Sequence, residues 1–200
     1  MSAPVEFYFD FSSPYGYFAA CGIDALAAKH SREVSWRPIL LGVVFKTTGG
    51  KPLPELPLKG DYARIDMHRC ARQAGIPFKL PAKFPIAAQV PSRAVYWAET
   101  QGPRRARQLG LALYRALFAE GRDISDPEVA ADVAAAQGLS RQAALAALND
   151  PAIKDRLRQE TENAMKKGVF GSPYFIADGE PFWGADRMER LDRWLATGGW

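Results

Sequence analysis

The sequence contains little cysteine and little histidine. Only two residues of each type occur among 200. The cysteines, Cys21 and Cys70, do not form a Cys-x-x-Cys pair, and no cysteine–histidine cluster has the spacing of a metal site. We therefore expect no bound metal, and we expect both cysteines to pack in the core.

Long apolar runs and targeting signals are also missing. No apolar run approaches the ~20 residues that a bilayer-spanning helix needs. Strand-like sequence begins near Val5, without the basic region, apolar segment and cleavage site of a signal peptide. These absences predict a cytoplasmic protein with no membrane partner.

Charge of one sign is only weakly in excess. The formal net charge is +4 and the basic residues are scattered along the chain. The densest group is Arg104-Arg105 with Arg107, which is more typical of the solvated start of a helix than of a nucleic-acid site. We therefore expect no nucleic-acid partner, whereas a small anionic substrate would suit the mild positive charge.

The clearest local pattern runs from Phe7 to Tyr17. Its aromatic and β-branched residues predict a strand buried on both faces, from Val5 to Phe11. Ser12-Ser13-Pro14 then favours the start of a helix, because serine is a preferred N-cap and proline suits the first helical position. The free N–H groups at such a start attract anions, although an ordinary capped helix is the alternative.

The order of predicted elements is β-α-β, then helices and loops, then β-β-α. Strands are expected at 5–11, 33–39, 174–177 and 181–183, with the first two parallel. Helices are expected at 14–29, 61–74 with Ile65 inward, 92–102 capped by Ser92, 103–119, 126–138, from Ser140, 150–167, and after Asp186, whose partner Glu189 completes a capping-box pattern.

Neither flank of the chain has enough sheet to be stable alone. Proline and glycine crowd the stretches 49–60 and 77–91, which are expected to be loops. The sequence therefore predicts an α/β fold in which 1–42 and 167–200 form one domain, with 43–166 as a large inserted all-α domain.

Three motifs together resemble a known family. They are Phe7-Tyr8-Phe9-Asp10-Phe11-Ser12-Ser13-Pro14-Tyr15, Val169-Phe170-Gly171-Ser172-Pro173 and Phe182-Trp183-Gly184-Ala185-Asp186-Arg187. They resemble the 2-hydroxychromene-2-carboxylate isomerases, which group with the kappa-class glutathione transferases and the DsbA-like disulfide oxidoreductases. The resemblance implies a thioredoxin-like domain with a helical insertion, bound glutathione as cofactor, and a homodimer.

The resemblance makes Ser13 the catalytic residue. Ser13-Pro14-Tyr15-Gly16 stands where redox relatives carry Cys-x-x-Cys, so direct thiol–disulfide exchange by the protein is excluded. A free thiol has a pKa of ~8.5, and only its thiolate is a good nucleophile. A hydroxyl donating to sulfur at a helix N-terminus favours that anion. Ser13 is thus expected to stabilise the thiolate of glutathione.

Further glutathione contacts follow from the other two motifs. The resemblance implies a cis peptide bond before Pro173, which leaves the Ser172 backbone free to pair with the glutathione peptide. A trans proline at a strand start is the alternative. The resemblance also assigns the γ-glutamyl end to Trp183, Gly184, Ala185 and Asp186, with Asp186 as a plain N-cap in the alternative reading.

The substrate side rests on fewer residues. The resemblance places Lys46 near a substrate carboxylate and Phe84 against a substrate ring, with a surface lysine and core packing as the alternatives. The polar pair of the family falls near Leu53-Pro54, which is a departure from its pattern. His30 and His68 are expected on helix surfaces. For Lys59 and Arg93 a solvated face is favoured over a supply of positive charge to the substrate.

Three functions remain open on the sequence. The first is a glutathione-dependent isomerase of aromatic catabolism that converts 2-hydroxychromene-2-carboxylate, or a related small aromatic carboxylate, to trans-o-hydroxybenzylidenepyruvate. The second is a kappa-like glutathione transferase or peroxidase. The third is a glutathione-binding module without catalysis.

Overall fold

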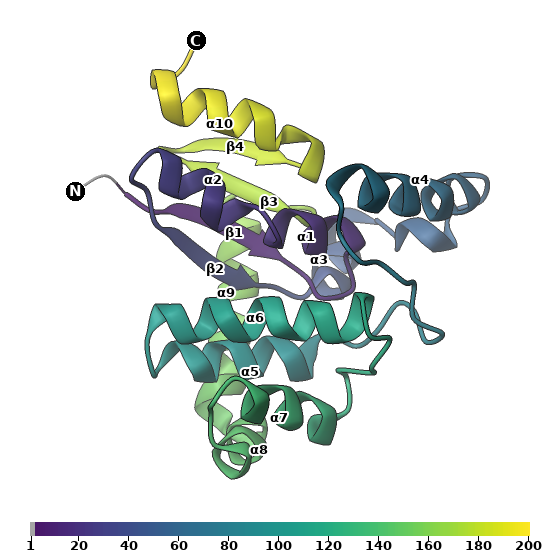
Figure 1. Ribbon diagram of the computed structural model, residues 1–200, viewed down its shortest axis with the longest axis vertical. Helices are drawn as coiled ribbons and strands as arrows, with labels where there is room; N and C mark the ends of the chain where they lie inside the picture. Colours follow the sequence, from purple (N-terminus) through teal and green to yellow (C-terminus); the bar gives the residue numbers. More distant parts are fainter. Residues whose placement is uncertain (1–2) are drawn as a thin grey trace.

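A computed structural model describes residues 3–200 of the chain. Within that part, four strands form one mixed sheet in the order β2-β1-β3-β4 (Figure 1). The strands are β1 (Val5–Phe9), β2 (Val34–Pro38), β3 (Tyr174–Ala177) and β4 (Glu180–Trp183). The parallel pairing of β1 with β2 is confirmed, and β3 joins β1 antiparallel, so both ends of the chain meet in one sheet.

The central strand β1 is buried on both faces, as its composition predicts. On one face Phe7 stacks on Phe175 at 5.4 Å between ring centroids and meets Trp36 edge-on at 5.1 Å. On the other face Tyr8 packs in a separate apolar cluster with Ile39. Full burial of a side chain of this size stabilises the fold by about 1.5–3 kcal/mol, which explains why the strand lies in the centre.

Helices cover both faces of the sheet. One face carries α1 (Pro14–Ala20), α2 (Ile23–Lys29) and α10 (Met188–Thr197), while α9 (Pro151–Lys166) and α3 (Leu41–Thr48) pack on the other (Figure 1). The prediction of one helix over 14–29 is wrong. The helix breaks at Gly22, where a side chain would approach Met188 of α10 at 3.4 Å.

The remaining helices form the middle of the chain. They are α4 (Lys59–Ala74), α5 (Gln89–Glu99), α6 (Pro103–Phe118), α7 (Pro127–Ala136) and α8 (Arg141–Asn149). The caps Asp126, Ser140 and Asp150 are confirmed, because each accepts a hydrogen bond from the first turn of its helix. The domain boundaries at 42/43 and 166/167 stay predictions.

Two details of the helical segment are wrong. Ser92 does not cap α5, which begins at Gln89 and buries Ser92 completely within it. Ile65 does not face inward: it is 60% exposed, and Met67 takes the buried position. The helix α3 lies where no helix was expected, and the short η1 turn (Leu53–Glu55) interrupts the proline-rich loop.

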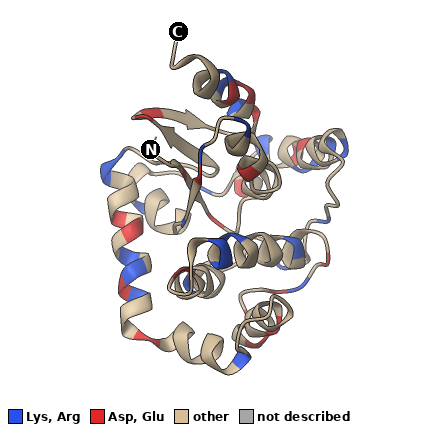
Figure 2. Ribbon diagram, turned by 60° about the vertical axis from the view of Figure 1, so that its left-hand side comes forward, with Lys and Arg blue, Asp and Glu red and all other residues tan. Residues whose placement is uncertain are grey.

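Basic and acidic residues alternate along the helices in the view of Figure 2. Arg105, in the densest basic group, donates to the carbonyl of Gln137 rather than standing free. Among residues 3–200, no helix combines the length and the apolar character needed to traverse a bilayer.

Candidate functional site

Ser13 lies at the start of α1, directly after the central strand. Its Oγ accepts a hydrogen bond from the Gly16 N–H at 3.0 Å, so it is the N-cap of α1. The same hydroxyl donates to the Ser172 carbonyl oxygen at 2.8 Å. Ser13 is only 8% exposed. Ser13 therefore caps α1, and its hydroxyl proton is engaged by a carbonyl of a loop near the other end of the chain.

That loop precedes β3 and contains a cis peptide bond between Ser172 and Pro173. The Asp10 N–H donates to Ser172 Oγ at 2.9 Å, and the Gly184 N–H donates to the Pro173 carbonyl at 3.0 Å. The structure thus brings the three sequence motifs together at one end of the sheet. The first motif bonds to Ser172, 159 or more residues away, and the second motif bonds to the third through Gly184.

The buried carboxylate of Asp10 holds the turn that carries Ser13 in place. Asp10 Oδ1 accepts from the N–H and the hydroxyl of Ser12 at 2.7 and 2.6 Å, and Oδ2 accepts from the Leu41 N–H at 2.7 Å. Burial raises the pKa of Asp10, against the lowering effect of these hydrogen bonds. Asp10 therefore joins the Ser12–Ser13 turn to the start of α3. Sequence reasoning missed it, although the spacing Asp-x-Ser was a usable signal of an Asx-turn.

The fourth strand brings Trp183 over the same loop. Its half-exposed indole lies against Gly171, where a Cβ would come within 2.2 Å of the indole nitrogen. The ring of Phe170 meets that of Trp183 at 4.7 Å. Glycine at position 171 is thus needed for the close approach of the Trp183 ring to the backbone.

The prediction that Asp186 caps the last helix is wrong. Asp186 lies in a short 3-10 turn (Ala185–Arg187), and α10 begins at Met188. Its exposed carboxylate pairs with Arg187 at 2.9 Å instead. Gly184, with φ of 112°, turns the chain so that a Cβ there would meet the Asp186 carboxylate. This geometry leaves Asp186 free of a capping duty and near the solvent.

A second polar group adjoins α1 from the side of α4. Tyr15 donates its hydroxyl to Asp66 Oδ2 at 2.8 Å, and the Cys70 thiol lies 3.6 Å from the same oxygen. Burial and the Asp66 carboxylate raise the pKa of Cys70, so this half-buried thiol stays protonated at neutral pH. The pair Asp66 and Cys70, four residues apart on one helix face, was not identified from the sequence.

The predicted substrate residues stand apart from these contacts. Lys46 is exposed in the last turn of α3. The partly buried Phe84 packs against the main core, edge-on to Phe118 at 6.1 Å between ring centroids. Within the part of the chain that the structure describes, Lys46 makes no hydrogen bond to Ser13 or Ser172. Arg93 donates to the Leu148 carbonyl instead of facing an open site.

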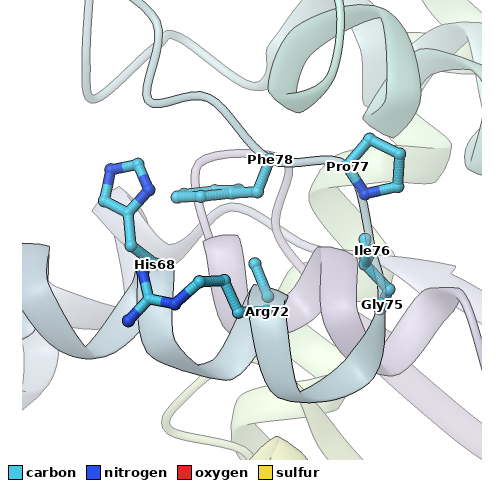
Figure 3. Close-up of a pocket in the computed structure, with 7 residues that line it drawn as sticks. His68, Arg72, Gly75, Ile76, Pro77 and Phe78 are labelled. Atoms are coloured by element: carbon cyan, nitrogen blue, oxygen red, sulfur yellow. The ribbon is translucent and has the colours of Figure 1, made fainter.

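A hollow of about 390 Å³ lies between the C-terminal half of α4 and the segment that follows it (Figure 3). The ring of Phe78 crosses it, with His68 and Arg72 along the helix side. Ser13, Ser172 and Trp183 do not line it. The site around Ser13 is therefore distinct from this hollow.

Comparisons with known proteins agree with this arrangement. Residues 4–196 match the family described as DSBA-like thioredoxin domain. A 2-hydroxychromene-2-carboxylate isomerase of Sphingobium xenophagum is 28% identical over 197 residues, 98% of this chain and 99% of the relative. Human glutathione S-transferase kappa 1 is 27% identical over 211 residues, 96% of this chain and 92% of the relative.

A solved structure of a 2-hydroxychromene-2-carboxylate isomerase superposes with a TM-score of 0.85 at 28% identity, over 96% of this chain and 94% of that one. The family resemblance and the predicted α/β fold, a thioredoxin-like domain with a helical insertion, are thus confirmed. The chain belongs to the family of DsbA-like thioredoxin domains.

Proposed function

We propose that the protein is a glutathione-dependent isomerase that acts on a small aromatic carboxylate. The observation that carries the proposal is the position of the Ser13 hydroxyl, held between the Gly16 N–H and the Ser172 carbonyl beside a cis proline. Similarity to isomerases and to kappa-class glutathione transferases along nearly the whole chain supports the use of glutathione.

The proposed site works by an exchange of hydrogen bonds. In the structure the Ser172 carbonyl accepts a hydrogen bond from Ser13. A glutathione peptide that pairs with the Ser172 backbone would donate to this carbonyl in place of Ser13. The released Ser13 hydroxyl then donates to the sulfur. Trp183 and the turn at Gly184 to Asp186 hold the γ-glutamyl end in this proposal.

The size of the effect follows from the short helix. α1 (Pro14–Ala20) has only seven residues, so its dipole contributes little. The Ser13 hydroxyl must therefore supply most of the stabilisation of the thiolate. One hydrogen bond to a charged group contributes about 1.5–3 kcal/mol, equivalent to a fall of about 1–2 units in the thiol pKa from ~8.5. A large share of the bound thiol is then ionised at neutral pH.

The reaction needs no net consumption of glutathione. The thiolate forms a carbon–sulfur bond with a conjugated carbon of the substrate. The hemiketal ring opens, its ring C–O bond breaking and its hydroxyl proton passing to the ring oxygen, which leaves a ketone and a phenol. The former double bond is then outside any ring and rotates as a single bond. The carbon–sulfur bond then breaks, its electron pair returns to the sulfur, and the double bond forms again in the other geometry. Lys46 and Phe84 are proposed to hold the substrate carboxylate and ring.

The test is isomerisation of 2-hydroxychromene-2-carboxylate with and without glutathione, in wild type and Ser13→Ala. We expect the rate to depend on both, and independence from either would refute the proposal. A stable glutathione conjugate with a standard electrophile would favour the kappa-like transferase. The apolar Leu53, which stands near the family's polar substrate residues, supports this second candidate. Glutathione binding with no turnover would indicate a binding module.

The homodimer, the place in aromatic catabolism and the cytoplasmic location stay predictions. Size-exclusion chromatography with light scattering tests the first of them. We expect a mass of twice 22.0 kDa.

A further inference from the structure

Gly16 is surrounded closely by oxygen atoms. A Cβ at this position would lie 2.5 Å from the Tyr114 hydroxyl oxygen and 2.9 Å from Ser172 Oγ. Gly16 is in α1 and does not have a positive φ, so its backbone does not require glycine. The glycine is required by space. This position is the fourth of Ser13-Pro14-Tyr15-Gly16, where a Cys-x-x-Cys sequence has its second thiol.

The Tyr114 oxygen that fills this space is fixed. Tyr114 belongs to α6 of the helical segment, is fully buried, and donates its hydroxyl to the Asp10 carbonyl at 2.8 Å. Its ring packs on Phe11 at 4.7 Å between centroids. Burial raises the pKa of Tyr114 well above its ordinary value, so the phenol stays protonated. The ring therefore has no open space into which it can move away from residue 16.

Tyr114 also adjoins the loop that holds Ser13. The Ser172 hydroxyl faces the Tyr114 oxygen and lowers the pKa of the phenol, against the larger effect of burial. Ser172 Oγ accepts from the Asp10 N–H, while Tyr114 donates to the Asp10 carbonyl. Tyr114 and Ser172 are thus tied to both sides of one residue, and the Ser172 carbonyl in turn accepts from Ser13.

We propose that Tyr114 is a positioning residue of the sulfur site, which acts through Ser172 on Ser13. Its hydroxyl takes the room of a side chain at position 16, so that the site accommodates the single sulfur of a bound thiol and no second thiol from α1. This inference deepens the proposed function and rests on it, because the bound sulfur is that of glutathione.

The packing part is tested without any ligand, by a double-mutant cycle of Gly16→Ala and Tyr114→Phe read in thermal unfolding. We expect Gly16→Ala to lower Tm strongly in the wild type and less in Tyr114→Phe, because phenylalanine lacks the closer of the two clashing oxygens, while Ser172 Oγ remains at 2.9 Å. If Gly16→Ala alone does not fold, folding of the double variant is the same result. Additive effects, or a double variant that does not fold, would overturn the inference.

Tyr96→Phe is the matched control for the lost hydrogen bond. Tyr96 is equally buried and donates its hydroxyl to the Pro38 carbonyl at 2.8 Å, away from Gly16. We expect it to lower Tm about as much as Tyr114→Phe without rescuing Gly16→Ala. Equal rescue by both substitutions would show a general effect of core loosening and would refute the specific contact.

The positioning part is read from the bound thiol. The ultraviolet absorbance of the glutathione thiolate is followed against pH in wild type, Tyr114→Phe and Tyr96→Phe. We expect Tyr114→Phe to raise the pKa of the bound thiol by about half a unit, the scale of a partly lost hydrogen bond, and Tyr96→Phe to leave it unchanged.

The two ideas fail in different ways. An unchanged thiol pKa in Tyr114→Phe would overturn the positioning role while glutathione binding stands. Absence of glutathione binding to the wild type would overturn the proposed function, and the positioning role would fall with it.

Discussion

Asp10 and Asp123 offer a comparison within one chain. Each begins an Asp-x-Ser turn in which Oδ1 accepts from both the N–H and the hydroxyl of the serine two residues on, Ser12 or Ser125. The second oxygen differs: Asp10 Oδ2 accepts from the buried Leu41 N–H, whereas Asp123 Oδ2 pairs with exposed Lys83 at 2.9 Å. The local geometry is the same and the surroundings are opposite.

The surroundings decide the expected cost of replacing each carboxylate with an amide. In Asp10→Asn, the amide oxygen keeps the two bonds from Ser12, and its NH₂ group then faces the Leu41 N–H. A buried N–H without an acceptor costs about 1–3 kcal/mol. We expect a loss of about 2 kcal/mol, which lowers Tm by about 4–8 °C in a chain of this size. Asp123→Asn should cost less than about 1 kcal/mol, because its ion pair is exposed and screened.

The pH dependence of the two variants has opposite sign. Burial raises the pKa of Asp10 in the folded state, so folding favours the protonated form. Stability due to Asp10 is present below its unfolded pKa of 3.8 and is lost as the pH rises through the folded value. Hydrogen bonds from Ser125 and Lys83 lower the pKa of Asp123 instead, so its contribution is present above 3.8 and lost as the pH falls.

Urea unfolding of wild type and both variants between pH 3 and 7 checks this reasoning. We expect the wild type to gain stability over Asp10→Asn as the pH falls, and to lose its advantage over Asp123→Asn over the same range. Equal free energies of unfolding for wild type and Asp10→Asn, or the same sign of pH dependence in both variants, would refute it.

Three other substitutions separate packing from function. Ser13→Ala removes a helix cap and a hydrogen bond to Ser172, and it should lower the free energy of unfolding by about 1–2 kcal/mol. Ser140→Ala removes only the cap of α8. It should cost about 1 kcal/mol or less and leave glutathione turnover unchanged. Thermal scans and kcat/KM measure both. Gly171→Ala should move the half-exposed Trp183 outward. We expect the Kd for glutathione to rise several-fold, with a Tm change below about 2 °C. Unchanged binding by calorimetry would contradict a role for Trp183.

Local patterns predicted the strands and caps well. Tyr174–Ala177 forms a strand with the expected bounds, and the caps at Asp126 and Ser140 hold because an N-cap depends on residues within one turn. Asp186 failed as a cap although its sequence carried a capping-box pattern. The chain there turns at Gly184 into a 3-10 segment, and this tertiary constraint outweighs the local preference.

Ile65 shows a second kind of failure. The helical period over 59–74 is genuine, but the stripe was placed on the wrong face, since Ala63 and Met67 are buried and Ile65 is exposed. A helix rich in charge gives a weak apolar pattern, and one large side chain then dominates the assignment. Small residues that permit close packing, such as Ala63, carry the contact instead.

The site itself divides in the same way. The residues that belong to the three motifs came from the resemblance, which located Ser13, Ser172 and Trp183 but not the long-range hydrogen bonds of the site. The Ser13 hydroxyl donates to Ser172, 159 residues away, and Tyr114 donates to the Asp10 carbonyl from 104 residues away. No local pattern encodes such pairs, since they arise only when the sheet brings both ends of the chain onto α6. The chemistry proposed for Ser13 therefore depends on groups that entered the site through folding, and a substitution at Tyr114 should reach the sulfur although the two lie in different parts of the sequence.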